Sequence, residues 1–533
     1  MNGKLLIVGW DGATWDYIDP LLAQGDLPNL AALLERGVRA TMRSTAPPFT
    51  NIAWPSMVTG LSPAQTGVYD AVRTMPGTYD RVPTNLEGFR GIPIWHWANR
   101  YGRSAGVLNV PMTHPAHELE GCLVSGFDTP VGANDAAYPP SILGKWAEQG
   151  HVYDVLDRER ALMDHQNPHQ QRLSLEEFTT EWVRLTIDQG EHAAWLLRTH
   201  PVDLAFVVLS GTDSINHRTR DVSRIGRVYQ AADAALGTIL AAVNDDALIC
   251  LVSDHGSTPA HNYIALNRLL HDAGWLHFRP ELSERTWRRL PAAQAKTGLS
   301  VWRTLPPWAR RMLSWPWLQI DARLGSSADN IDWARTKVYA RSSLGPLYIN
   351  LEGREPEGCV PLANYGSLRA EVIHRLSEAQ TPDGRRLFRR VWRIEELYPQ
   401  AKPDDHHPDI LLEPADWRDH MITGYPSDPV VRPIPARTEY GTHTPDGTVA
   451  LAGPRIRHGA RLGTINIVDA MPTLLAAWGL PVPAETDGRV VEDAFVTPPV
   501  VQSEPSGPEA ERIAARAGGT NVLDRLRALG YVE

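Results

Sequence analysis

Apolar runs that end in polar residues recur along the chain and predict the strands of an α/β sheet. The clearest runs cover residues 5–8, 204–209, 247–252 and 448–451. Runs that are apolar at every position are typical of strands buried on both faces, as in parallel sheets. Further strands are expected at 38–43, 106–110, 123–126, 347–351 and 409–412.

Helical periodicity fills several of the gaps between these runs. Leu30, Leu33 and Leu34 recur at the spacing of one helix face, and Gly37 fits the end of that helix. Further helices are expected at 52–61, 175–197, 371–376 and 465–478. Strands that alternate with helices in this way indicate an α/β fold whose central sheet is mostly parallel.

One segment departs from this alternation. Residues 269–335 lack strand-like runs and hold many of the tryptophans and arginines of the chain. We expect a mainly helical insertion there, which packs as a cap, closes as a lid over a substrate or contacts a membrane surface. The formal net charge of −10 disfavours the membrane contact.

A chain of 533 residues is longer than one hydrophobic core usually serves. We expect either one large domain with an insertion or two domains. The predicted boundaries are a catalytic α/β core at 1–268 and 336–490, the cap or lid at 269–335 and a flexible C-terminal segment at 491–533. The end of this last segment, at 522–531, has the pattern of a short helix.

Charge and cysteine content narrow the class of protein. The net charge is mild for this length and argues against a nucleic-acid polymer as a partner. Cys122, Cys250 and Cys359 are too few and too far apart for a disulfide framework or a Cys-based metal site. No run approaches the roughly 20 residues of a transmembrane helix, and the first run is shorter than a signal-peptide core. We therefore expect a cytoplasmic protein, and the sequence does not define its oligomeric state.

Acidic residues and histidines lie beside four of the apolar runs. In chain order they are Asp11, Asp213, His217, Asp254, His255 and His443. Taken singly, each is readily explained as a turn former, a helix cap or a chance neighbour. Because the carboxyl ends of parallel strands share one edge of a sheet, the recurrence of the acids and of His217 and His255 after strands favours a common site. The spacing of Asp213 and His217 also lets both side chains share one helix face.

Three carboxylates and three imidazoles suit zinc or manganese and are a poor match to calcium. They exceed what one catalytic ion takes, and they fit two ions roughly 3.5–4 Å apart, an arrangement that favours phosphoryl transfer. Thr50 lies in a hydroxyl-rich loop before the helix expected at 52–61. It is either the N-cap of that helix or a nucleophile whose phosphorylated form would face the helix N-terminus.

These motifs resemble, in content and order, those of the alkaline phosphatase superfamily. The stretches that carry the resemblance are Gly9-Trp10-Asp11-Gly12, Thr50 followed by Trp54 to Gly60, Asp213 with His217, Asp254-His255-Gly256 and Gly441-Thr442-His443. The chain is most similar to the type I phosphodiesterase/nucleotide pyrophosphatase branch, and closest to its bacterial and archaeal group of predicted phosphohydrolases. The resemblance implies an alkaline-phosphatase-like fold with a mostly parallel central sheet and helices on both faces.

The resemblance also implies roles for these residues. One divalent ion, zinc or manganese, would be held by Asp213, His217 and His443. The other would be held by Asp11, Asp254, His255 and the oxygen of Thr50. Thr50 would attack phosphorus in line and carry the phosphoryl group until water hydrolyses it. The implied activity is cleavage of phosphodiester or pyrophosphate bonds in small, nucleotide-like substrates.

One departure from the family pattern concerns the substrate. Nucleotide pyrophosphatases carry an Asn beyond the nucleophile that contacts the phosphate, whereas this chain has Gly67 to Arg73 there, without Asn. Arg73 would either supply this contact or lie on the surface, and Asn51 is a second candidate for substrate binding. A guanidinium suits a monoester, which carries more negative charge than a diester. A phosphomonoesterase or phosphotransferase is therefore an alternative, as is a binding protein that keeps the metal but catalyses weakly.

Overall fold

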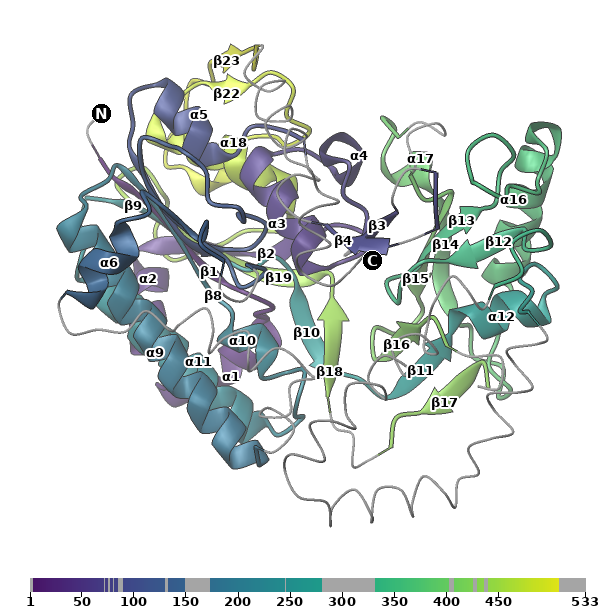
Figure 1. Ribbon diagram of the computed structural model, residues 1–533. Coiled ribbons are helices and arrows are strands. Elements are labelled where there is room, and N and C mark those ends of the chain that lie inside the picture. The colour runs from purple at the N-terminus through teal and green to yellow at the C-terminus, as the bar shows by residue number, and fades with distance from the viewer. Residues whose placement is uncertain are drawn as a thin grey trace.

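A ten-stranded sheet lies at the centre of the larger part of the molecule, which we call the core (Figure 1). The computed structural model describes residues 3–70, 72–74, 77–79, 81–84, 90–129, 133–148, 173–244, 246–279, 331–401, 407–424, 429–435 and 440–507. The strands of this sheet, in spatial order, are β20 (Ala460–Arg461), β2 (Gly37–Arg43), β19 (Asp446–Ala452), β9 (Leu248–Val252), β1 (Leu5–Trp10), β8 (Leu204–Leu209), β5 (Ala105–Val110), β6 (Gly121–Ser125) and β7 (Ala137–Tyr138). The tenth strand, β21 (Ile465–Asn466), pairs with β2.

The sheet is mostly parallel, as the sequence predicts. The neighbouring strands β9, β1, β8, β5 and β6 all run in the same direction, whereas β19 is antiparallel to β9 and β2. Strand β1 is bonded to β9 on one side and to β8 on the other. These three strands are the ones that the acidic motifs follow, so the sheet brings their carboxyl ends side by side.

Helices cover both faces of the sheet, which confirms the predicted α/β layers (Figure 1). One face is covered by α1 (Trp15–Gln24), α2 (Pro28–Glu35), α6 (Ile142–Ala147), α9 (Leu175–Thr199) and α11 (Val222–Leu240). The other is covered by α3 (Thr50–Thr59), α5 (Ile94–Arg100) and α18 (Ala470–Trp478). Successive residues of β1 pack on opposite faces, with Leu6 and Val8 on the first and Leu5 and Ile7 on the second. Both faces are covered, and this explains why β1 is apolar throughout.

A smaller unit lies beside the core and is inserted between two paired strands (Figure 1). These strands, β10 (Gly256–Pro259) and β18 (Gly441–Thr444), form an antiparallel ribbon that joins the two parts. The sheets of the smaller unit are formed by β12 (Val338–Ala340), β13 (Pro346–Ile349), β15 (Ile410–Pro414) and β14 (Phe388–Arg393), and by β16 (Asp419–Ile422), β11 (Asn262–Ala265) and β17 (Val431–Pro433). Its helices are α12 (Leu266–Asp272), α16 (Leu362–Ser377) and α17 (Ile394–Leu397). The unit has a hydrophobic cluster of its own.

The smaller unit extends over more of the chain than the cap that the sequence predicts. Strands between 338 and 433 belong to the smaller unit, although the sequence assigns 336–490 to the core. Residues 280–330, most of the expected insertion at 269–335, lie outside the described residues, and the boundaries and role of that insertion stay a prediction. Trp275 and Trp333, which lie near the two ends of the expected insertion, are buried in the smaller unit.

The C-terminal part differs from the sequence prediction in two places. The helix expected at 465–478 begins as β21 and a 3-10 turn, η3 (Ile467–Asp469), because its first residues pair with β2. Residues 491–507 also pack on the core: η4 (Glu492–Ala494) precedes the buried side chain of Phe495, and β23 (Ser503–Glu504) pairs with β22 (Val482–Pro483). The short helix predicted at 522–531 lies outside the described residues.

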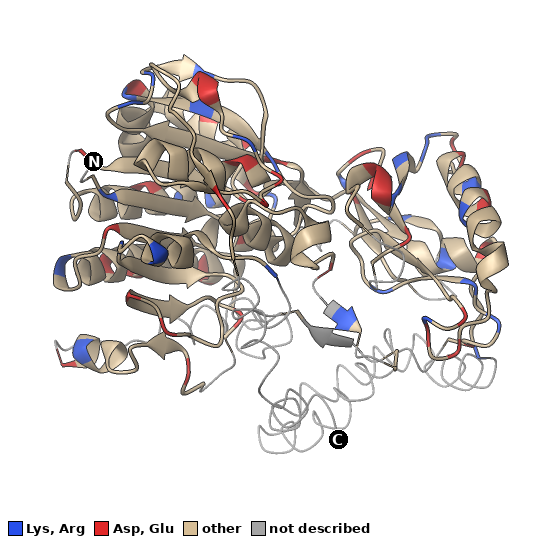
Figure 2. Cartoon of the chain, turned by 90° about the horizontal axis from the view of Figure 1, so that it is seen from above, with Lys and Arg blue, Asp and Glu red and all other residues tan. Residues whose placement is uncertain are grey.

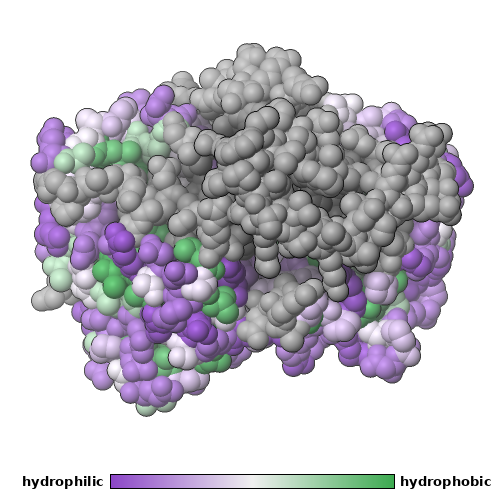
Figure 3. Space-filling model, turned by 60° about the horizontal axis from the view of Figure 1, so that its bottom comes forward, coloured by the Kyte–Doolittle hydropathy of each residue, from purple (hydrophilic) through white to green (hydrophobic). Residues whose placement is uncertain are grey.

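The described surface carries both signs of charge. Basic and acidic positions are interspersed over the core and the smaller unit (Figure 2). On the face drawn in Figure 3, hydrophobic residues form small patches among hydrophilic ones. Among the residues that the structure describes, no helix is long and apolar enough to cross a bilayer. The expected cytoplasmic location and the disfavoured membrane contact stay predictions.

Candidate metal centre

The three acidic motifs meet at the carboxyl ends of neighbouring strands. Asp11 directly follows β1, Asp254 follows β9, and Asp213 lies in the short helix α10 (Gly211–Ser214) after β8. All three side chains are buried. Gly12 permits this approach, because it has a φ of +64° and a Cβ atom there would lie 2.6 Å from Oδ1 of Asp213.

Hydrogen bonds between the strand-end loops hold the motifs in register. The hydroxyl of Thr212 donates to the carbonyl of Asp11 over 2.6 Å. The backbone N–H of Gly12 donates to Oδ1 of Asp254 over 3.2 Å, and the hydroxyl of Ser257 donates to the carbonyl of Gly12 over 2.7 Å. The loops after three strands are thereby tied to one another, which pre-organises the carboxylates.

The first potential ion site is formed by Asp11, Asp254 and His255, whose ligand atoms lie within 4.8 Å of one another. Nε2 of His255 is 3.4 Å from Oδ2 of Asp254 and 3.6 Å from Oδ1 of Asp11. The hydroxyl of Thr50 points at the same place, 3.2 Å from Nε2 of His255 and 3.5 Å from Oδ1 of Asp11. The four residues of this site are buried, each being no more than 6% exposed.

The second group shares His255 with the first. Asp213, His255 and His443 have ligand atoms within 4.8 Å of one another. His217 joins them, because its Nε2 lies 3.0 Å from Oδ2 of Asp213 and 3.1 Å from Nε2 of His443. The side chain of His217 remains 31% exposed, so this group lies on the solvent side of the centre.

Backbone carbonyls orient two of the imidazoles. Nδ1 of His255 lies 3.0 Å from the carbonyl of Gly256, and Nδ1 of His443 lies 3.2 Å from the carbonyl of Pro48. A carbonyl oxygen only accepts, so each Nδ1 donates its proton there and each Nε2 keeps a lone pair that is available to a cation. Metal-binding histidines are commonly oriented in this way.

The three buried carboxylates of the cluster lie close together, and their environment shifts the pKa of each. Burial raises the pKa of Asp11, and the charges of Asp254 and Asp213 raise it further. Burial also raises the pKa of Asp254. For Asp213, burial is outweighed by the imidazoles of His217 and His443, which hold its pKa below the usual range.

These residues fit a pair of divalent cations. Oδ1 of Asp213 and Oδ2 of Asp254 are buried and have no hydrogen-bond partner among the described residues. Buried carboxylate oxygens without partners are costly unless a cation compensates them. Imidazole nitrogens and carboxylate oxygens together are the donor set of zinc and manganese sites.

Thr50 is the first residue of α3, and its hydroxyl faces the cluster. The N-cap of this helix is Phe49, which makes no capping bond, so the interpretation of Thr50 as the cap is wrong. The N–H groups of the first turn of a helix have no partner within the helix and favour negative charge. Thr50 therefore lies where a nucleophile would need to be to place a phosphoryl group against these N–H groups.

Two residues that the sequence predicts to bind substrate, Asn51 and Arg73, form no hydrogen bond with the metal-ligand cluster among the described residues. Asn51 is half-buried beside Thr50, and within the described residues its side chain makes no hydrogen bond. Arg73 lies on β3 (Val72–Thr74), which forms a hairpin with β4 (Arg81–Pro83). Its Nε atom is buried and has no hydrogen-bond partner among the described residues. The roles of Asn51 and Arg73 stay predictions.

Tyr398, which the sequence analysis did not select, connects the smaller unit to the loop before Thr50. Its hydroxyl accepts from the N–H of Ala46 over 2.9 Å and donates to the carbonyl of the same residue over 3.0 Å. Tyr398 is distant in sequence and carries no motif, so no local pattern could have marked it.

Replacing Tyr398 by Phe is expected to loosen this loop. The variant should lose about 1 kcal/mol of stability, and kcat should fall roughly tenfold because the nucleophile is less well positioned. Steady-state kinetics and thermal melts measure both effects. Tyr365→Phe is the control, because that hydroxyl donates to Asp409 within the smaller unit. Equal kcat in the two variants would contradict the positioning role.

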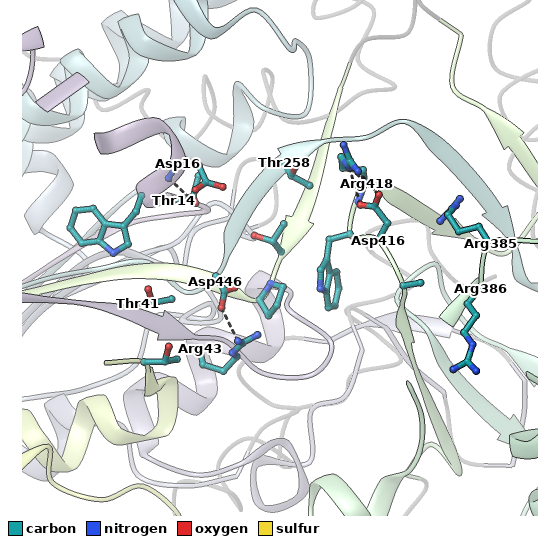
Figure 4. Close-up of a pocket in the computed structure, with 16 residues that line it drawn as sticks. Thr14, Asp16, Thr41, Arg43, Thr258, Arg385, Arg386, Asp416, Arg418 and Asp446 are labelled. Carbon is teal, nitrogen blue, oxygen red and sulfur yellow. Dashed lines mark hydrogen bonds and ion pairs between the residues drawn. The ribbon is translucent and has the colours of Figure 1, made fainter. Parts of the chain in front are cut away.

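A separate cleft of about 730 Å³ lies between the core and the smaller unit (Figure 4). Its walls carry guanidinium groups from both parts. Three of them are paired: Arg43 with Asp446 at 3.2 Å, Arg418 with Asp416 at 2.6 Å and Arg385 with Asp419 at 2.5 Å. None of the predicted metal ligands lines it. The cleft therefore does not belong to the candidate centre.

The fold and the ordered motifs define a member of the alkaline phosphatase superfamily. The chain belongs to the type I phosphodiesterase/nucleotide pyrophosphatase family, since a model of that family matches residues 5–446. This confirms the resemblance seen in the sequence and identifies the protein as a hydrolase of this family. Members of the family typically depend on divalent metals.

Solved structures of other proteins share the fold. Murine ectonucleotide pyrophosphatase/phosphodiesterase 5, an inactive variant in complex with AMP, is 14% identical with a TM-score of 0.51, over 92% of this chain and 100% of that chain. Phosphonoacetate hydrolase from Sinorhizobium meliloti, in complex with phosphonoacetate, is 16% identical with a TM-score of 0.54, over 88% and 94%. No curated protein sequence matches the chain.

Proposed function

We propose that the protein is a two-metal phosphohydrolase that cleaves phosphodiester or pyrophosphate bonds through a phospho-threonine at Thr50. The observation that carries the proposal is the position of the Thr50 hydroxyl, 3.2 Å from Nε2 of His255 at the start of α3. The family supports nucleotide-like substrates, and the AMP bound to the murine relative is of this class.

Two sets of side chains would hold the ions. The buried set is Asp11, Asp254, His255 and Thr50, and the more exposed set is Asp213, His217 and His443. Bound zinc or manganese would supply positive charge that favours ionised oxygens and offsets the charge that develops on the phosphoryl group.

The residues of the chain would carry the reaction in two steps. Thr50 attacks phosphorus in line, the bond to the leaving group breaks, and the phosphoryl oxygens face the first turn of α3. Water then enters from the side of His217, where the centre is open to solvent, and hydrolyses the phospho-threonine. The hydroxyl of Thr50 is restored.

A phosphomonoesterase or phosphotransferase at the same site is the second candidate. The buried Nε of Arg73, which has no hydrogen-bond partner among the described residues, favours it, because a guanidinium suits the extra charge of a monoester.

Assays with bis-p-nitrophenyl phosphate and p-nitrophenyl phosphate separate the two candidates. We expect kcat/KM to be about tenfold or more higher on the diester, since none of the arginines that the structure describes is in contact with the metal ligands. A higher value on the monoester, lost in Arg73→Ala, would favour the second candidate. If the protein showed no metal-dependent turnover of either nitrophenyl ester or of dinucleotides, this would contradict the proposal that it is a hydrolase.

A further inference from the structure

We infer that Trp54 is a positioning residue that orients Asp11 for metal binding, an inference that rests on the proposed two-metal function. The indole N–H of Trp54 donates to Oδ2 of Asp11 over 3.2 Å. The other oxygen, Oδ1, faces the cluster, 3.5 Å from the hydroxyl of Thr50 and 3.6 Å from Nε2 of His255. Trp54 therefore gives the two oxygens of Asp11 different partners and leaves one for an ion.

The chemistry of indole suits this task. Its N–H is a donor only and does not titrate, so it holds a carboxylate oxygen without competing for the cation as a ligand. A carboxylate held through one oxygen binds an ion through the other, with its rotation restricted. The bond is buried on both sides, since Trp54 and Asp11 are each no more than 1% exposed.

The fold holds the indole in place from two directions. Trp54 lies one turn after Thr50 on α3, so the nucleophile and the indole share one helix face. The ring packs edge-on against Phe206, with centroids 5.8 Å apart. On β1, a Cβ atom at Gly9 would lie only 2.6 Å from the ring of Trp54, so a larger residue there would displace it. Helix α3 thus couples the nucleophile to the orientation of Asp11.

Titration calorimetry with zinc on the metal-free chain tests this role. Trp54→Phe should weaken one of the two binding events by about 10- to 100-fold, the usual effect of removing a partner of a metal ligand. The loss of kcat at limiting zinc should be largely recovered at saturating zinc. The matched control is Trp97→Phe, because Trp97 is buried and its N–H donates to the carbonyl of Pro481 over 2.7 Å, away from the centre. That variant should keep the zinc affinity of the parent.

A second variant tests the same contact without replacing Trp54, in case Trp54→Phe does not fold. Gly9→Ala keeps the indole but should displace it, and it is expected to weaken the same binding event. If the parent bound two ions and folded Trp54→Phe and Gly9→Ala bound zinc with unchanged affinity, the inference about Trp54 would be overturned. The proposed two-metal function would stand. A parent that binds no divalent ion would overturn the proposed function and the inference together.

Discussion

Replacing Thr50 by Ala is expected to lower kcat by about three orders of magnitude or more. The methyl group of Ala cannot attack phosphorus, and the hydroxyl that lies near both Asp11 and His255 is removed. Zinc should still bind, because the three remaining ligands of the buried site are unchanged. Stopped-flow kinetics and calorimetry on the same preparation measure both properties.

Thr50→Ser is the matched control for this experiment. It keeps a hydroxyl at the same position and should retain far more activity than the alanine variant. If Thr50→Ala turned over within tenfold of the parent on every substrate, Thr50 would not be the nucleophile, and a binding protein that keeps the metal would become the better account.

Removal of the metal is expected to abolish turnover and to lower the melting temperature. Three buried carboxylates lie together, and the charges of Asp254 and Asp213 raise the pKa of Asp11 beyond the effect of burial. An ion held at about 1,000 times its Kd stabilises the folded state by about 4 kcal/mol, and this is lost on chelation. Scanning fluorimetry and activity assays with EDTA, followed by zinc or manganese, measure the loss and its recovery.

The pH dependence of the metal-free protein provides a control. Asp11 and Asp254 have raised pKa values in the folded state, so their contribution to stability is lost as the pH rises through those values. The pKa of Asp213 is lowered, so that residue is ionised in both states over the mildly acidic to neutral range. The loss of melting temperature on chelation should therefore be larger at neutral than at mildly acidic pH. An equal melting temperature with and without EDTA at both would contradict bound metals.

The parts of the site that the sequence predicts are those that follow a strand directly. Asp11 and Asp254 each come just after an apolar run, and the parallel order of β9, β1 and β8 brings them together. The strand and its end can both be recognised in the local sequence, because the apolar run marks the strand and the residues after it mark the end. The α/β class was predictable for the same reason, whereas the helices on both faces were implied by the resemblance to the alkaline phosphatase superfamily.

The parts that the sequence does not predict depend on contacts between distant segments. The bond from Trp54 to Asp11 needs α3 to lie against β1, and the bonds from Tyr398 to Ala46 need the smaller unit to dock on the core. Ile465 begins a strand and not a helix because β2 is there to pair with it. The secondary-structure propensities of the residues carry no information about these contacts between distant segments.

The most direct test of the two-metal centre is a crystal structure of the zinc-loaded protein with anomalous scattering. We expect two ions roughly 3.5–4 Å apart. One should lie about 2.0–2.2 Å from ligand atoms of Asp11, Asp254, His255 and Thr50. The other should lie at the same distances from Asp213, His217 and His443. A single ion, or ions bound to other residues at saturating zinc, would contradict it.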